Sequence, residues 1–173
     1  MRLVAIVGTW KSGKTTVVER LVGRLASHGH VVGTLKLIES ESFTIHPEGR
    51  DTSRHWDAGA HVSIALAPNE TTVVRRTGGS HEDLGGVMDL VPPGVDVLVC
   101  EGLLTGGPDV RTVVCAKSPD QVAPLLRELH PDSHPVAVSG MVAASVEEAA
   151  GLPALNVLEE EGLDRLVDLV TGE

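Results

Sequence analysis

The sequence predicts an α/β protein: a layered fold with a largely parallel central sheet, flanked by helices and including a β-hairpin. Three observations lead to this prediction. Short apolar runs alternate with segments of helical periodicity, an arrangement typical of parallel sheets. A glycine-rich turn, Gly8 to Thr16, joins the first apolar run to the first helical segment. The 173 residues contain no internal repeat and no linker, so we expect a single domain over residues 1–173.

The composition is that of an ordinary globular chain, with 42% hydrophobic and 22% charged residues. The net charge of -10 argues against a nucleic-acid partner, because phosphate backbones are bound by a surplus of Lys and Arg. We expect Cys100 and Cys115 to be buried thiols of a reduced protein; a disulfide between them is the alternative. The start lacks a signal-peptide pattern and no apolar run reaches the ~20 residues of a membrane span, so we expect a cytoplasmic protein without a membrane partner.

The first part of the chain reads as one βαβ unit. A buried strand is expected over Arg2–Val7 and a second strand over Val31–Leu37. Gly29 is a plausible end for the helix between them. The helix is predicted from apolar residues that share one face, namely Val17, Val18, Leu21, Val22 and Leu25.

The middle of the chain predicts a short helix over Asp51–Ala58, closed by Gly59. Two strands follow, His61–Pro68 and Thr71–Arg76, and turn residues between them indicate a hairpin. A further helical piece is expected over Glu82–Leu90.

The rest of the chain predicts three strands and three helices. The strands are expected at 95–102, 110–116 and 134–140, and the helices at 118–130, 145–151 and 158–170. The first of these helices has Ser118 as a candidate N-cap and Pro119 at its first position. Pro124 should kink this helix or delay its start.

The turn after the first strand has the pattern GxxxxGK[ST], formed by Gly8, Gly13, Lys14 and Thr15, with a strand before it and a helix after it. Backbone N–H groups of such a loop, and of the helix that starts there, converge on phosphate oxygens. Lys14 would bridge the terminal phosphates, and the Thr15 hydroxyl would coordinate Mg²⁺. We therefore expect a P-loop NTPase-like fold that binds a nucleoside triphosphate.

Two residues at the tip of this loop have two interpretations each. Lys11 either touches phosphate or a partner, or is a solvated lysine. Trp10 either forms an interface or ligand lid, or covers the start of the helix. Thr9 occupies the position where ATPases of the partitioning type carry an extra lysine, which disfavours that subclass.

Acidic residues near such a loop hold the metal or orient water. Glu101 ends the apolar strand Val95–Cys100, at the edge of the sheet where ligands bind in such folds; the alternative is an acid that faces solvent. Asp51 is a candidate outer-sphere partner of Mg²⁺, and Arg54 a candidate for neutralising the terminal phosphate. Alternatively, Asp51 is an ordinary N-cap and Arg54 an exposed side chain.

Four stretches, "GTWKSGKTT", "VVGTLK", "EGRDTSRHWDAGA" and "VDVLVCEG", resemble the MobB family in their order and spacing. That family is the GTP-binding adapter of molybdopterin-guanine dinucleotide biosynthesis. The resemblance covers roughly the first two-thirds of the chain, and its most specific part is the segment from Asp51 to Ala60. This chain departs from the family pattern after Lys36, where Glu39 and Glu41 stand in place of a His pair.

The resemblance implies a GTPase-like protein with GTP and Mg²⁺ as cofactors, weak intrinsic hydrolysis and a homodimeric assembly. It also implies a partner enzyme, a molybdopterin guanylyltransferase. By position it assigns the phosphates and the metal to the loop residues Gly8, Thr9, Trp10, Lys11, Ser12, Gly13, Lys14, Thr15 and Thr16. It assigns the metal and catalytic roles to Thr15, Asp51, Glu101 and Lys14, and it adds as charged candidates Lys36, Arg50 and Arg54.

Two other functions remain open from the residues alone. A P-loop small-molecule kinase generally needs a lid with several arginines; Arg75 and Arg76 are candidates, but no Arg-rich helical segment accompanies them. A nucleotide-stabilised interaction module without turnover, or an ATP-binding accessory protein, is the third interpretation. The tail lacks an Asn-Lys-x-Asp guanine motif, and "VSGM", Val138 to Met141, lies where base-contacting loops often occur.

Overall fold

The computed structural model describes residues 1–173 except 41–42, 44, 46–50, 78–83, 103–109 and 173. Its contacts divide the chain into two units: Met1–Leu37 together with Val91–Glu173, and Ile38–Leu90. Our expectation of a single domain stays a prediction.

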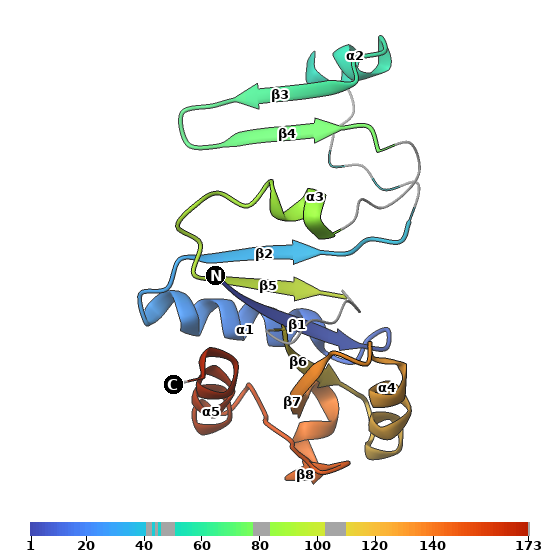
Figure 1. The fold of residues 1–173 in the computed structure, drawn as a ribbon, viewed down its shortest axis with the longest axis vertical. Helices are drawn as coiled ribbons and strands as arrows, with labels where there is room; N and C mark the ends of the chain where they lie inside the picture. Colours follow the sequence, from blue (N-terminus) through green and yellow to red (C-terminus); the bar gives the residue numbers. More distant parts are fainter. Residues whose placement is uncertain (41–42, 44, 46–50, 78–83, 103–109, 173) are drawn as a thin grey trace. The chain divides into compact units, whose positions relative to one another are not determined.

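The first unit contains a parallel sheet, which confirms the predicted α/β class (Figure 1). Among the described residues it has five strands, whose order is β2 (Val32–Lys36), β5 (Val97–Glu101), β1 (Arg2–Gly8), β6 (Val110–Cys115) and β7 (His134–Ser139). Each pair of neighbours is parallel. Because all five strands run the same way, their carboxyl ends meet at one edge of the sheet, where ligands bind in such folds.

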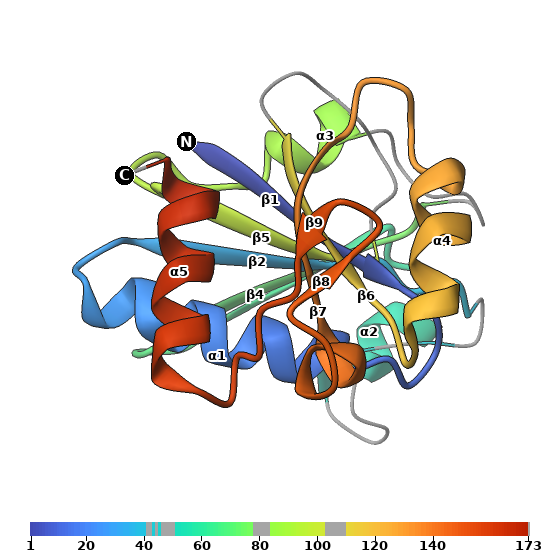
Figure 2. The ribbon, with the colours of Figure 1, turned by 90° about the horizontal axis from the view of Figure 1, so that it is seen from below.

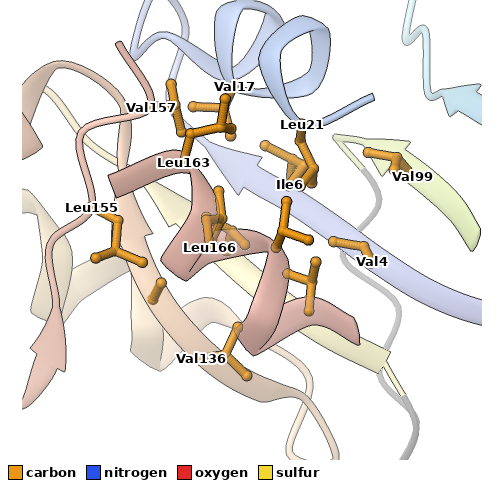
Figure 3. Close-up of a cluster of buried hydrophobic side chains, with 14 of the residues drawn as sticks. Val4, Ile6, Val17, Leu21, Val99, Val136, Leu155, Val157, Leu163 and Leu166 are labelled. Carbon is orange, nitrogen blue, oxygen red and sulfur yellow. The ribbon is translucent and has the colours of Figure 1, made fainter. Parts of the chain in front are cut away.

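Helices cover both faces of this sheet, and β1 contributes apolar side chains to the packing on both faces. Val4 and Ile6 of β1 pack into one buried cluster with α1 (Lys14–Ser27) and α5 (Glu160–Thr171) (Figures 2 and 3). Ala5 and Val7 belong to the cluster on the opposite face, where Leu125, Leu126 and Leu129 of the α4 region pack. Strands that are buried on both faces read as continuous apolar runs, which is why the sequence revealed them.

The helices α1 and α5 present the apolar faces expected for them. In α1 the buried residues are Val17, Leu21 and Leu25, and in α5 they include Leu163, Leu166, Val167 and Val170. Ion pairs join the outer surfaces of the two helices: Arg24 pairs with Glu160 and Asp164, and Arg20 Nη2 lies 3.2 Å from Glu160 Oε1. The end of α1 is also as predicted, because Gly29 follows it with φ 90°.

The helix after β6 begins later than the apolar pattern alone suggests. A 3₁₀ turn, η1, spans Pro119–Gln121, and the α-helix α4 spans Val122–Glu128. Pro124 therefore lies in the first turn of α4, where a residue has no intrahelical partner for an N–H group, so the predicted delay is confirmed. Ser118 lies at the N-cap of η1 and Pro119 at its first position, as predicted, although the Ser118 side chain makes no capping hydrogen bond.

The helix expected at 145–151 is wrong. After β7 the chain forms a 3₁₀ turn, η2 (Gly140–Ala144), and then a small antiparallel pair of strands, β8 (Glu148–Ala149) and β9 (Leu152–Pro153). Ala150 and Gly151 between them have φ of 51° and 80°, which no right-handed helix accommodates.

The second unit consists of α2 (Asp51–Asp57), the hairpin β3 (Val62–Leu66) and β4 (Thr71–Arg75), and α3 (Leu84–Met88). The hairpin is antiparallel, which confirms the prediction. Gly59 follows α2 with φ 106°, as expected for its end. The predicted start of α3 at Glu82 lies outside the described residues. Across the described part of the chain, no helix is long and apolar enough to cross a bilayer.

Candidate functional site

The loop between β1 and α1 is pressed closely onto the neighbouring strand β6. Gly8 has φ 148°, and a Cβ atom added there would lie 2.0 Å from the Cys115 carbonyl oxygen. Gly13, with φ 96°, directly precedes α1. Only glycine satisfies both the dihedral angle and the space at Gly8, so this turn specifically requires a residue without a side chain.

A second contact comes from the loop after β7, which the sequence suggested as a place for contacts to the base and not as a support of the phosphate loop. A Cβ atom on Gly140, whose φ is 80°, would lie 2.1 Å from the Ser12 carbonyl oxygen. The Met141 N–H donates to that same oxygen over 3.1 Å. The glycine in "VSGM" was the available signal, but its meaning depends on β7 lying two strands from β1. Gly140 therefore packs directly against the loop between β1 and α1.

Several polar groups of the loop are directed at its interior. Lys14 Nζ donates to the carbonyl oxygens of Gly8 at 3.0 Å and Thr9 at 2.8 Å. The hydroxyls of Ser12 and Thr9 are buried and find no hydrogen-bond partner among the described residues. No described side chain caps the start of α1, which leaves its first N–H groups available. A buried donor without a partner is unfavourable, so this cradle is suited to receive an anion.

Three residues from three elements meet beside this loop. Thr15 Oγ1 donates to Glu101 Oε1 over 3.1 Å, which joins the start of α1 to the end of β5. Lys36 Nζ, at the end of β2, lies 3.2 Å from the same carboxylate oxygen. Lys36 and Glu101 are direct neighbours in the register of β2 and β5. The structure therefore brings together three of the predicted site residues.

A hydroxyl and a carboxylate are hard oxygen donors of the kind that Mg²⁺ prefers. The Glu101 side chain is 11% exposed, so its charge is largely shielded from water and favours a cation beside it. The residues present thus fit a divalent cation held by Thr15 and Glu101. The alternative of a solvent-facing acid at Glu101 is wrong, because the side chain is directed to Thr15 and Lys36.

The tip of the loop is exposed. The Trp10 ring is 74% exposed, and Lys11 Nζ lies 4.2 Å from its centroid, a cation–π contact. Lys11 has φ 57°, an uncommon angle for a residue other than glycine. Thr16 is exposed in the first turn of α1. A role for Trp10, Lys11 or Thr16 toward phosphate stays a prediction.

Two further candidates lie in the second unit. Asp51 is the first residue of α2, and its side chain and that of Arg54 are 87% and 77% exposed. Their charged atoms, Asp51 Oδ1 and Arg54 Nη1, lie 3.7 Å apart. Their proposed approach to the metal and the phosphate stays a prediction. Arg50 lies outside the described residues.

Both cysteines are free and buried, so the disulfide alternative is wrong. Cys115 lies beside the start of the loop, since it is the register partner of Gly8 in the pairing of β1 and β6. Burial raises the pKa of its thiol to about 12, an effect that Lys14 opposes and Glu101 reinforces. Burial likewise raises the pKa of Cys100 to about 11. Neither thiol is available as a nucleophile at neutral pH.

A comparison with known protein families matches residues 3–122 to MobB, described as molybdopterin guanine dinucleotide synthesis protein B. The chain belongs to the MobB family. The match covers β1 from Leu3 onward, the loop, α1, the second unit and β5, so the candidate phosphate and metal ligands lie within it. The resemblance seen in the sequence is confirmed.

Relatives of known name agree with this family. A probable molybdopterin-guanine dinucleotide biosynthesis adapter protein of Bacillus subtilis (strain 168) is 27% identical over 99% of this chain and 94% of its own length. The crystal structure of Bacillus subtilis MobB is similar at a TM-score of 0.71 and 23% identity, with both chains fully covered. A MobB protein homolog from Bacillus stearothermophilus gives a TM-score of 0.72 at 22% identity, again over 100% of both chains. At these identities the structural likeness shows the fold.

Proposed function

We propose that this chain is a cytoplasmic GTP-binding adapter of molybdopterin-guanine dinucleotide biosynthesis, with weak GTPase activity. Its partner is the enzyme that transfers GMP to molybdopterin. Membership of the MobB family supports the pathway, as does the adapter name of the Bacillus subtilis relative. The phosphate-loop pattern and its geometry support the nucleotide.

One observation carries the proposal: the Thr15 hydroxyl contacts the nearly buried Glu101 carboxylate at the uncapped start of α1. The loop beside this contact has hydrogen-bond donors without partners, which suit the phosphates of a nucleoside triphosphate. The hydroxyl and the carboxylate suit its cation.

Each residue has a distinct part in this proposal. The backbone of the loop and the Ser12 hydroxyl hold phosphate oxygens, and the Lys14 ammonium moves from its carbonyl partners to the terminal phosphates. Thr15 and Glu101 hold Mg²⁺, which neutralises charge on the phosphates when it is bound. Glu101 also orients the attacking water. Asp51 and Arg54 would join from the second unit.

The kinase alternative is less well supported. Arg76, a candidate lid arginine, is engaged within its own unit: Nη2 donates to the Trp56 carbonyl oxygen at 2.7 Å and Nε to that of Ala60 at 3.2 Å. Its guanidinium also lies 4.2 Å from the Trp56 ring centroid. Arg76 would have to give up these three contacts in order to bind a transferring phosphate.

A homodimer is part of the proposal, and the hairpin of the second unit supports it. Val62, Ile64 and Leu66 alternate along one face of β3 and are 48%, 61% and 85% exposed. Val73, the register partner of Ile64, is 52% exposed. An apolar face of this kind is unfavourable in water and is typical of an interface. We propose that a second copy of this chain covers it.

The test of the function combines binding with product analysis. Calorimetry with GTP and ATP, each with MgCl₂, measures whether the base is discriminated; we expect GTP to bind more tightly. Phosphate release is then followed with and without a molybdopterin guanylyltransferase. Slow release of phosphate without an acceptor supports the adapter. Transfer of the phosphate to a metabolite would establish the kinase, and no heat with either nucleotide would refute the proposal.

A further inference from the structure

One oxygen of Glu101 serves two partners. Oε1 accepts a hydrogen bond from Thr15 Oγ1 at 3.1 Å and forms an ion pair with Lys36 Nζ at 3.2 Å. The side chain of Glu101 is 11% exposed and that of Lys36 is 56% exposed. The carboxylate is therefore held in place, whereas the ammonium is free to move into solvent without loss of packing.

The two partners reach Glu101 from different directions in the fold. Lys36 is the register neighbour of Glu101 in the sheet, and Thr15 belongs to the first turn of α1. Thr15 Oγ1 also lies 3.3 Å from Glu101 Oε2, so a cation held by Thr15 and Glu101 would lie against the same carboxylate that the Lys36 ammonium contacts. Two positive charges close to one another repel, so Mg²⁺ and this ammonium compete for the carboxylate.

We propose that Lys36 is the built-in counter-charge of this cation site: its ammonium neutralises Glu101 while Mg²⁺ is absent and is displaced when Mg²⁺ binds. The inference rests on the proposed function and extends it, because it assigns Lys36 to the carboxylate rather than to the nucleotide. Lys36 is in these terms a positioning residue that acts through Glu101.

The consequence concerns nucleotide binding without metal. With Lys36 in place, a triphosphate that arrives without Mg²⁺ meets a neutralised carboxylate. Without Lys36, the triphosphate meets a negative charge that is largely shielded from water, and the two repel. Bound Mg²⁺ neutralises the carboxylate in both proteins, so the difference in GTP affinity between the proteins with and without Lys36 disappears. Lys36 therefore lowers the dependence of nucleotide affinity on Mg²⁺.

The test measures the Kd for GTP by calorimetry, once in saturating MgCl₂ and once in EDTA. The Kd in EDTA is divided by the Kd in MgCl₂, and this ratio is compared between the variants and wild type. In Lys36→Met we expect this ratio to rise about tenfold over wild type, mainly through weaker binding in EDTA. Lys36→Arg keeps the charge and should keep the ratio. Arg2→Met removes an exposed cation at the opposite end of β1 and should also leave the ratio unchanged.

A second background tests whether Lys36 acts through the carboxylate. In Glu101→Gln there is no charge to neutralise, so adding Lys36→Met should not raise the ratio further. Because Lys36 is half-exposed, the Met variant is expected to fold; circular dichroism verifies this, and Lys36→Gln repeats the test with a polar side chain.

The outcomes separate this inference from the function on which it rests. An equal loss of affinity in MgCl₂ and in EDTA would show that Lys36 contacts the nucleotide itself and would overturn the inference alone. An unchanged ratio in Lys36→Met would also overturn it alone. If wild type binds no GTP in MgCl₂, the proposed function fails and the inference fails with it.

Discussion

The Thr15 hydroxyl donates to the Glu101 carboxylate over 3.1 Å, although 86 residues separate them in the chain. Their contact joins the first turn of α1 to the end of a fully buried strand. It also predicts how Glu101 variants should behave.

Glu101→Gln should slow GTP hydrolysis more than it weakens GTP binding, because orienting water is needed only in the transition state. We expect kcat to fall by roughly 10²-fold and Kd in MgCl₂ to rise by less than about tenfold. Phosphate release and calorimetry measure the two effects. Hydrolysis at the wild-type rate would show that Glu101 does not have this role.

Lys14→Ala should remove most nucleotide affinity and leave the fold intact. Among the residues that the structure describes, its Nζ donates to two loop carbonyl oxygens and does not enter the core. Loss of a charge-assisted hydrogen bond of about 1.5–3 kcal/mol corresponds to a rise in Kd of roughly 10- to 150-fold. Lys11→Ala is the matched control, and it decides between the two interpretations of Lys11: a solvated lysine leaves Kd unchanged. The circular dichroism spectra of both variants should match that of wild type, because the fold is retained.

Gly140→Ala should destabilise the protein by roughly 1–3 kcal/mol, because it combines a positive φ with a methyl group that collides with the Ser12 carbonyl oxygen. Gly23 in α1 is the matched control, since a Cβ there meets no atom within 4 Å. Gly23→Ala should stabilise by roughly 0.4–1 kcal/mol. Urea denaturation measures both changes. Equal stability of Gly140→Ala and wild type would contradict the close packing of this loop.

Cys115 should make the folded state sensitive to alkaline pH. Its pKa is raised from 9.0 to about 12 in the folded protein, so the folded state holds the proton more tightly than the unfolded state. The stabilising contribution is therefore complete below pH 9 and is lost as the pH rises from about 9 to about 12. Chemical denaturation across this range should give a shallower decline for Cys115→Ala than for wild type. Parallel curves for the two proteins would exclude the effect.

Ile64→Asp should shift the chain from dimer to monomer in sedimentation velocity, because a charge on the apolar hairpin face opposes burial against a second copy. Ile64 is 61% exposed, so the substitution should not unfold the hairpin. Leu158→Asp, at a site that is 67% exposed in the first unit, is the control and should remain dimeric. A wild-type monomer at all accessible concentrations would refute the proposed dimer.

Most of the fold was predictable because its signals are local. Strands β1 and β5 are largely buried on both faces, so they appear as uninterrupted apolar runs. The loop follows β1 directly and is recognisable in the sequence by its glycines and Lys14. Glu101 was predictable as a site residue from its position at the end of an apolar strand.

The rest depended on pairings that the sequence does not display. The segment 145–151 contains helix-forming Glu and Ala residues, yet the chain reverses at Ala150 and Gly151, and Ala149 is buried against Val138 and its neighbours. Tertiary packing overrode local propensity there. The structural role of Gly140 was not predicted, because it depends on close packing against the Ser12 carbonyl oxygen. Ser12 is distant in sequence, so no local pattern indicates this contact.

The joining of α1 to α5 has a consequence for how the protein is made. The loop is encoded at the beginning of the described elements, whereas α5, which closes the cluster around Leu21 and Ile6, is translated last among them. A nascent chain still lacking α5 would expose that cluster to water. Competence to hold a ligand at the loop should therefore arise only after α5 has emerged from the ribosome.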